Sequence, residues 1–249
     1  MNVKKLSLIG RKQYRYNDHI VINIPTLRQI RGQNEKEEEL FWSEVNLFTQ
    51  TPSDLISELD SMGVDFEELT DYDLFVLFFL IRKHSDMPNN KSLIFEDINI
   101  WKLLMINVET EAKPIFVNKK NEVILNETIF NDISNVISLI TGHPKTKKKK
   151  FGNSFAKKKR IEQDYKTKEK LRNKANKQNN VLDGIILRLV CNANFPYNFE
   201  TIQDVTIYDL IHSLKQIEKD IQVTDLMQSR LVGNDLSKLP QEQLSRFIL

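Results

Sequence analysis

A lysine-rich stretch interrupts the apolar pattern of this chain and limits how its core can form. Between Lys145 and Lys177 there are fifteen Lys or Arg residues and three acidic residues, a net charge of +12. Its first part, His143 to Phe155, includes proline, glycine and four consecutive lysines and has almost no apolar periodicity. Such a composition is typical of a mobile linker.

The remainder of the stretch, Ala156 to Gln178, predicts a polar helix with a thin apolar stripe that needs partners to be stable. We therefore expect three parts. They are an N-terminal α+β domain at residues 1–142, a lysine-rich linker and polar helix at residues 143–178, and a helical C-terminal domain at residues 179–249.

The N-terminal part predicts helices with small antiparallel β elements. Ile20, Ile22 and Ile24 recur at every second position, which indicates a half-buried strand of a hairpin that turns at Asn17-Asp18. A second hairpin is predicted from residues 115–117 and 123–125, which a short polar loop separates. Helices are expected over the ranges 37–50, 52–62, 71–81 and 128–141, and the third is apolar nearly all round, which predicts the centre of the N-terminal core.

The C-terminal part predicts two helices. Residues Val181 to Asn192 indicate a buried helix, and a long amphipathic helix runs from about Thr206 to Val232 with Asp204 as its N-terminal cap. The expected fold class is therefore α+β: a mostly helical N-terminal unit with small β elements, a lysine-rich linker, and a helical C-terminal unit.

A second charged region opposes the lysines. From Glu35 to Asp73 there are thirteen acidic residues and one lysine, a net charge of −12, although the whole chain carries only +2. The two regions predict a weak, salt-screened contact within one molecule or between copies.

No sequence motif for catalysis, a metal or a cofactor is found. The 7 glycines form no phosphate-binding cluster, the four histidines are scattered, and Cys191 is the single cysteine and reads as an apolar filler. A nuclease-like pair, Glu96-Asp97 and Glu111-Ala112-Lys113, is the weaker alternative, since Pro114 breaks the second strand. We therefore expect no enzyme and no cofactor, but a protein that binds other macromolecules.

The lengths of the apolar runs predict whether the chain is anchored in a membrane or secreted. The longest run, Leu74 to Ile81, is much shorter than the about 20 residues of a membrane helix. The first ten residues lack a long apolar stretch, so we expect neither a membrane anchor nor secretion by a signal peptide.

The expected interaction residues lie in the basic stretch and at the apolar C-terminus. They are Lys147, Lys148, Lys149, Lys150, Lys157, Lys158, Lys159, Arg160, Phe247, Ile248 and Leu249. The lysines are able to neutralise nucleic-acid phosphates without sequence preference, to pair with the acidic region, or to remain a solvated linker.

Three stretches resemble a family encoded among the tail-morphogenesis genes of phages that infect Gram-positive bacteria. They are residues 22–30 (INIPTLRQI), residues 48–74 (FTQTPSDLISELDSMGVDFEELTDYDL) and residues 206–210 (TIYDL). The matching positions are helix caps and core residues, and the family carries no catalytic residue to this chain. The lysine-dense insert and the Phe-Ile-Leu ending depart from the family pattern.

The resemblance implies a phage tail assembly factor, chaperone-like, that binds tail subunits such as the tape measure or tube protein in the cytoplasm of the infected host. A structural component of the virion tail, or a nucleic-acid-binding module, is the alternative.

Overall fold

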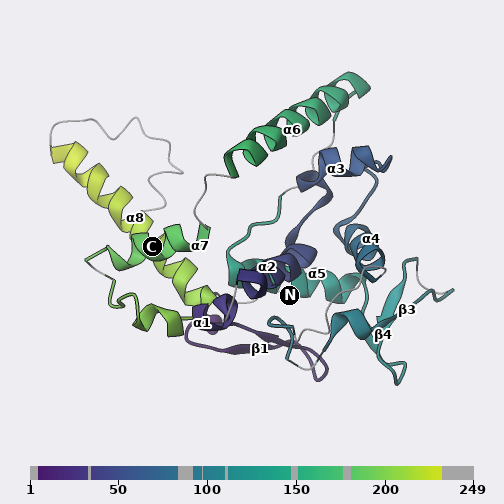
Figure 1. The fold of residues 1–249 in the computed structure, drawn as a ribbon, viewed down its shortest axis with the longest axis horizontal. Coiled ribbons are helices and arrows are strands. Elements are labelled where there is room, and N and C mark those ends of the chain that lie inside the picture. Colours follow the sequence, from purple (N-terminus) through teal and green to yellow (C-terminus); the bar gives the residue numbers. More distant parts are fainter. Residues whose placement is uncertain are drawn as a thin grey trace.

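The computed structural model describes residues 5–32, 35–83, 92–96, 98–109, 112–146, 151–175, 181–193 and 195–231. Within this part the chain forms eight α-helices and two small antiparallel sheets, so the α+β class is confirmed (Figure 1). The α-helices are α1 (Leu27–Arg31), α2 (Glu35–Thr49), α3 (Ile56–Ser61), α4 (Asp71–Lys83), α5 (Glu127–Thr141), α6 (Ser154–Ala175), α7 (Val181–Val190) and α8 (Ile207–Leu231). Short 3₁₀ helices are η1 (Lys5–Leu8), η2 (Pro52–Asp54), η3 (Ile100–Lys102) and η4 (Thr201–Asp204).

Both predicted hairpins form. Strands β1 (Gln13–Arg15) and β2 (Val21–Asn23) pair antiparallel, and the Asn17 side chain accepts hydrogen bonds from the backbone N–H groups of His19 and Ile20 in the turn. Strands β4 (Ile115–Val117) and β5 (Val123–Leu125) pair in the same way, and β3 (Leu104–Ile106) adds to β4 to give the order β3-β4-β5.

The main core forms around α5, which packs against α2, α4 and α8. Phe130 and Ser134 are fully buried, and the rings of Phe48, Phe75 and Phe130 lie within 5.0–5.7 Å of one another. Helix α4 contributes Phe75 and Phe79 to this core, but Ile81 near its end is 46% exposed. The centre of the core, which was predicted to be α4 alone, is therefore formed by α4 and α5 together.

The C-terminal helices join the same core. Leu182, Ile186 and Leu189 of α7 are buried in one continuous cluster with residues of α1, α2 and α5. Helix α7 is buried on one side only, because Leu187 is 56% exposed. The described parts of the two predicted units thus share apolar packing; whether each folds alone stays a prediction.

The N-terminal and C-terminal parts of the chain meet where α1 and α8 begin side by side. Thr26 and Thr206, just before α1 and α8, form an antiparallel bridge in which Leu27 N donates to Val205 O and Ile207 N to Pro25 O. Thr206, not Asp204 as predicted, caps α8: its hydroxyl accepts from Asp209 N at 3.1 Å. Asp204 lies in η4 and pairs with Arg28 instead.

Candidate interaction site

Helix α6 lies beside α3, away from the helices of the main core (Figure 1). The contact encloses a second apolar cluster, separate from the main core and formed by Ile56, Leu59, Phe66 and Leu74. Phe151 and Ile161, from the basic stretch, pack against this cluster. The Phe151 ring meets Phe66 edge-on, with centroids 6.1 Å apart.

Local sequence signals shape the acidic side of this contact. Thr51 and Asp54 form a capping box at the start of η2, with Pro52 at its first position. Gly63, with φ 72°, lets the chain reverse direction after α3. The loop that follows carries Asp65 and Glu67 toward α6.

The inward face of α6 follows helical spacing. Lys157, Ile161, Asp164 and Lys168 are separated by four, three and four positions, which places them on one side of a helix. Lys157 Nζ lies 2.5 Å from Asp65 Oδ2, 3.1 Å from Glu67 Oε2 and 5.1 Å from the centre of the Phe66 ring. Lys168 pairs with Glu58 and, at 2.8 Å, with Asp164.

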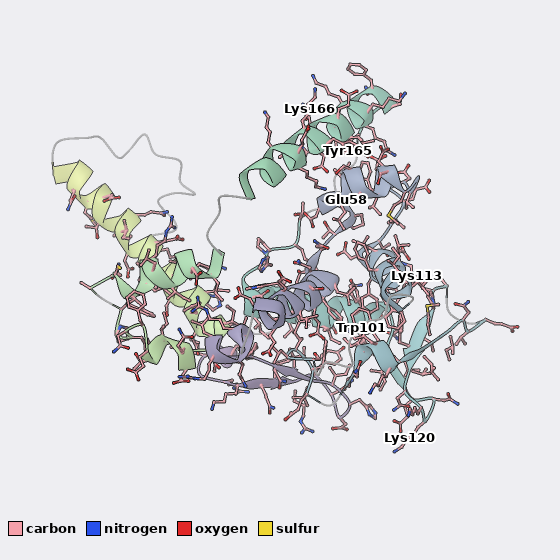
Figure 2. All side chains as sticks on the ribbon, viewed as in Figure 1. Glu58, Trp101, Lys113, Lys120, Tyr165 and Lys166 are labelled. Atoms are coloured by element: carbon pink, nitrogen blue, oxygen red, sulfur yellow. The ribbon has the colours of Figure 1, made fainter. Side chains whose placement is uncertain are left out.

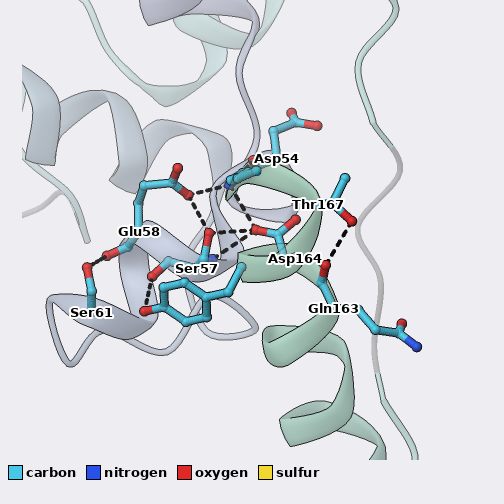
Figure 3. A network of polar contacts seen from close by, with 9 residues as sticks. Asp54, Ser57, Glu58, Ser61, Gln163, Asp164 and Thr167 are labelled. Atoms are coloured by element: carbon cyan, nitrogen blue, oxygen red, sulfur yellow. Dashed lines mark hydrogen bonds and ion pairs between the residues drawn. The ribbon is translucent and has the colours of Figure 1, made fainter. Parts of the chain in front are cut away.

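Asp164 caps α3 from another helix. Leu55, the residue before α3, supplies no side-chain cap. Asp164 Oδ2 instead accepts from the backbone N–H of Ser57 at 3.1 Å and from its hydroxyl at 2.7 Å (Figure 3). A carboxylate at this position satisfies an otherwise unpaired N–H and opposes the helix dipole.

Two further bonds join α6 to the start of α3 and to η2 just before it. The Tyr165 hydroxyl donates to the Ser57 carbonyl oxygen at 2.8 Å, and Lys168 Nζ donates to the Asp54 carbonyl oxygen at 3.0 Å. Figure 2 shows Tyr165 on the side of α6 that faces Glu58. Charged and neutral bonds from α6 therefore meet at the end of η2 and the first turn of α3.

The contact shifts the pKa values of its charged groups. The hydrogen bond from Lys157 lowers the pKa of Asp65, and the backbone N–H of Phe151 and then Lys157 lower that of Glu67. Burial raises the pKa of Asp164, but bonds from Lys168 and Ser57 outweigh it, so the net pKa is lowered. Bonding to Asp65 is the main reason that the pKa of Lys157 is raised.

The described ends of the predicted linker are also held by this region. Lys145 Nζ lies 3.2 Å from Asp71 Oδ2, and the Thr146 hydroxyl donates to Asp54 Oδ1 at 2.6 Å. The backbone N–H of Phe151 donates to Glu67 Oε1 at 2.8 Å. The predicted pairing of acidic and basic regions is therefore seen within one molecule, with apolar packing that was not expected.

The outward face of α6 carries a different set of lysines. Lys158, Lys159, Lys166 and Lys170 are exposed, and none has an ion pair with another residue in the part of the chain that the structure describes. Phe155, on the same face, is 75% exposed. Figure 2 shows Lys166 on the side of α6 away from α3.

The structure divides the interaction residues expected from sequence. Lys157 points inward, Lys158 and Lys159 are exposed, and Arg160 is half-buried. Residues 147–150 and 247–249 lie outside the described residues. Sequence reasoning missed Asp164, Lys166, Lys168 and Lys170, although helical spacing from Lys157 and Lys159 was the signal that would have found them.

The nuclease-like pair gains no support from Lys113. Its Nζ lies 2.6 Å from Glu127 Oε1, 3.2 Å from Asp73 Oδ1 and 2.6 Å from the Thr70 hydroxyl, so it ties α4 to α5. Asp97 and Glu111 lie outside the described residues.

Among the described residues, no three His, Cys, Asp or Glu side chains are grouped to hold a metal ion. No described helix combines the length and apolar composition needed to cross a bilayer. One core cavity has a wholly apolar lining of Ile20, Phe48, Phe95, Ile98, Ile100, Leu103, Ile124, Leu125 and Ile133.

Comparison of this chain with protein-family models, curated proteins and solved structures found no match.

Proposed function

We propose that this chain is a phage tail assembly factor that binds a tail subunit, such as the tape measure or tube protein, in the host cytoplasm. The observation that carries the binding role is the two-sided charge of α6. Its inward lysines are neutralised by α3 and the following loop, while its outward lysines have no ion pair among the described residues. Ion pairs on one side hold the helix in place so that the other side faces solvent.

The resemblance supplies the tail-assembly part of the proposal. Two of its stretches, residues 22–30 and 206–210, are far apart in the chain but meet at the Thr26–Thr206 bridge. The third stretch, residues 48–74, builds α3 and the acidic loop. The three resembling stretches therefore form the contact between the starts of α1 and α8 and the surface against which α6 packs.

The outward face favours an acidic protein surface as its partner. Phe155 offers an apolar contact beside Lys159, and Lys166 and Lys170 extend the positive charge along the helix. Glu162 and Glu169, also exposed, lie between these lysines. A protein surface is able to place a basic group opposite each of them beside its acidic groups, whereas a phosphate backbone is negative throughout.

Co-expression with the tape-measure and tube proteins of the same phage, followed by pull-down at low salt, tests the proposal. The variant Lys159→Gln/Lys166→Gln/Lys170→Gln should retain about tenfold less partner. The control Lys102→Gln/Lys119→Gln/Lys120→Gln removes the same charge from exposed lysines elsewhere and should retain the wild-type amount. Equal retention by the two variants, or no retained tail protein, would overturn the proposal.

Two measurements separate the alternatives. Stoichiometric amounts of the chain in purified particles, found by mass spectrometry, would indicate a virion component instead. Steeply salt-dependent binding of a single-stranded oligonucleotide, lost in the same α6 variant, would indicate a nucleic-acid-binding module.

A further inference from the structure

The face of α8 that packs on the core continues beyond the body of the protein, where it carries one exposed isoleucine and two polar residues. Leu210 is buried, and Leu214 and Ile217 pack against the main core. The same alternating spacing of four and three residues leads to Ile221, Thr224 and Gln228, which are exposed; Ile221 is 50% exposed. Figure 1 shows this distal half of α8 running away from the other helices.

Alternating steps of four and three are the spacing of a coiled-coil seam. Glu218 and Asp225 flank the seam on one side and Asp220 on the other, while Lys215 and Lys219 lie away from it. The flanks of the free half are therefore acidic, and its one lysine, Lys219, is on its back. A helix that packs on this seam gains most if its own flanks are basic.

Helix α7 provides a precedent within the molecule. It packs on α8 and buries Leu182, Ile186 and Leu189 in the core to which α8 also belongs. From its exposed side Arg188 Nη1 lies 3.5 Å from Glu218 Oε1, the first acidic flank of the seam. The proximal part of α8 thus already packs against a short helix that has an apolar face and a basic flank.

We propose that the distal half of α8, from Ile217 to Gln228, is a docking site for one basic amphipathic helix of a partner protein. A second copy of this chain fits poorly, because symmetric pairing of two α8 helices would bring acidic flanks together. A parallel pair opposes Asp220 and Asp225, and an antiparallel pair opposes Glu218 and Asp225. Thr224 and Gln228 in the seam make the contact a weak and reversible one.

Two designed peptides of about three heptads test this proposal with the full-length protein. Both have isoleucine and leucine at the seam; one has lysine at the flanks and the other glutamate. The wild-type chain should bind the lysine peptide at least about tenfold more tightly than the glutamate peptide, as measured by fluorescence anisotropy. The variant Glu218→Lys/Asp220→Lys/Asp225→Lys should reverse this preference.

The control Asp18→Lys/Asp60→Lys/Glu68→Lys makes the same charge change at exposed positions outside α8 and should keep the wild-type preference. Failure of the wild type to bind the lysine peptide, or equal changes in both variants, would overturn the proposal. Wild-type dimers in analytical ultracentrifugation that Ile221→Glu abolishes would also overturn it, since the occupant would then be a second copy. None of these outcomes depends on binding by α6.

Discussion

Asp164 shows how one side chain couples two helices. Its carboxylate accepts two bonds from Ser57 at the start of α3 and contacts Lys168 one turn along α6. The side chain is only 13% exposed, so these bonds are partly shielded from water. Because its pKa is lowered, the ionised form is the one that stabilises the contact.

Replacement of Asp164 should therefore have a pH-dependent cost. Asp164→Asn keeps an acceptor for Ser57 but removes the charge, and should lower the free energy of unfolding by about 1–2 kcal/mol near pH 7. A lowered pKa gives stability that is present above the unfolded-state pKa and is lost as pH falls through the folded-state pKa. The difference between variant and wild type should thus be smaller at about pH 3 than near pH 7.

Urea denaturation followed by circular dichroism at both pH values measures this difference. Glu162→Gln, the same type of change on the exposed face of α6, is the matched control and should cost less than about 0.5 kcal/mol at either pH. A cost for Asp164→Asn that is unchanged between the two pH values would contradict the role assigned to its charge.

At the scale of elements, two helix-ending glycines differ in what surrounds them. Gly63 after α3 and Gly142 after α5 have φ values of 72° and 67°, which residues with a Cβ rarely adopt. A Cβ at Gly63 would meet no atom within 4 Å, whereas one at Gly142 would lie 2.5 Å from Ile211 Cγ2 of α8. Gly142 therefore also permits the close approach of α5 and α8.

Alanine at these glycines should separate backbone strain from packing. Gly63→Ala should destabilise the chain by about 1–2 kcal/mol through the left-handed backbone alone. Gly142→Ala should cost a further about 1–3 kcal/mol, because Ile211 must shift. Thermal and chemical denaturation of the two variants measure this difference; equal costs would show that α8 does not pack on the end of α5 as described.

Sequence patterns predicted most elements but not their neighbours. The alternation at Ile20, Ile22 and Ile24 and the left-handed glycine after α5 act locally, so strand and helix end are readable from the chain. The cap of α8 was misplaced by two residues, because Thr206 and Asp204 are both good caps; Thr206 bonds with Asp209 three positions on, while Asp204 pairs with Arg28. Patterns within one element do not show which other element it packs against.

The site was predictable only in part for the same reason. A dense run of lysines indicates an interaction segment, but it does not say which lysines are neutralised within the molecule. That division depends on where the loop with Asp65 and Glu67 lies in space. The cap that Asp164 gives to α3 joins residues more than a hundred positions apart and has no local signal.

At the scale of the whole molecule, α6 is held by two kinds of force with different salt dependence. The ion pairs of Lys157 and Lys168 involve partly exposed groups, so dissolved salt screens them. The apolar packing of Phe151 and Ile161 on the second cluster is not screened. Salt alone should therefore loosen α6 without fully releasing it.

Small-angle scattering on salt titration tests this combination. Near about 0.5 M salt, where the screening length is about 4 Å, the wild-type radius of gyration should rise slightly. Ile161→Ala removes part of the apolar contact, so its radius should rise more over the same range. Ile9→Ala, at a side chain that is 59% exposed and outside both clusters, should follow the wild type.

The charge variants should differ already at low salt. Lys157→Gln/Lys168→Gln should be expanded there and Lys158→Gln/Lys159→Gln should not, because only the first pair faces α3 and its loop. A radius that is independent of salt in all five proteins would show that charge does not hold α6, and a rise in apparent mass at low salt would show that the same pairs form between molecules.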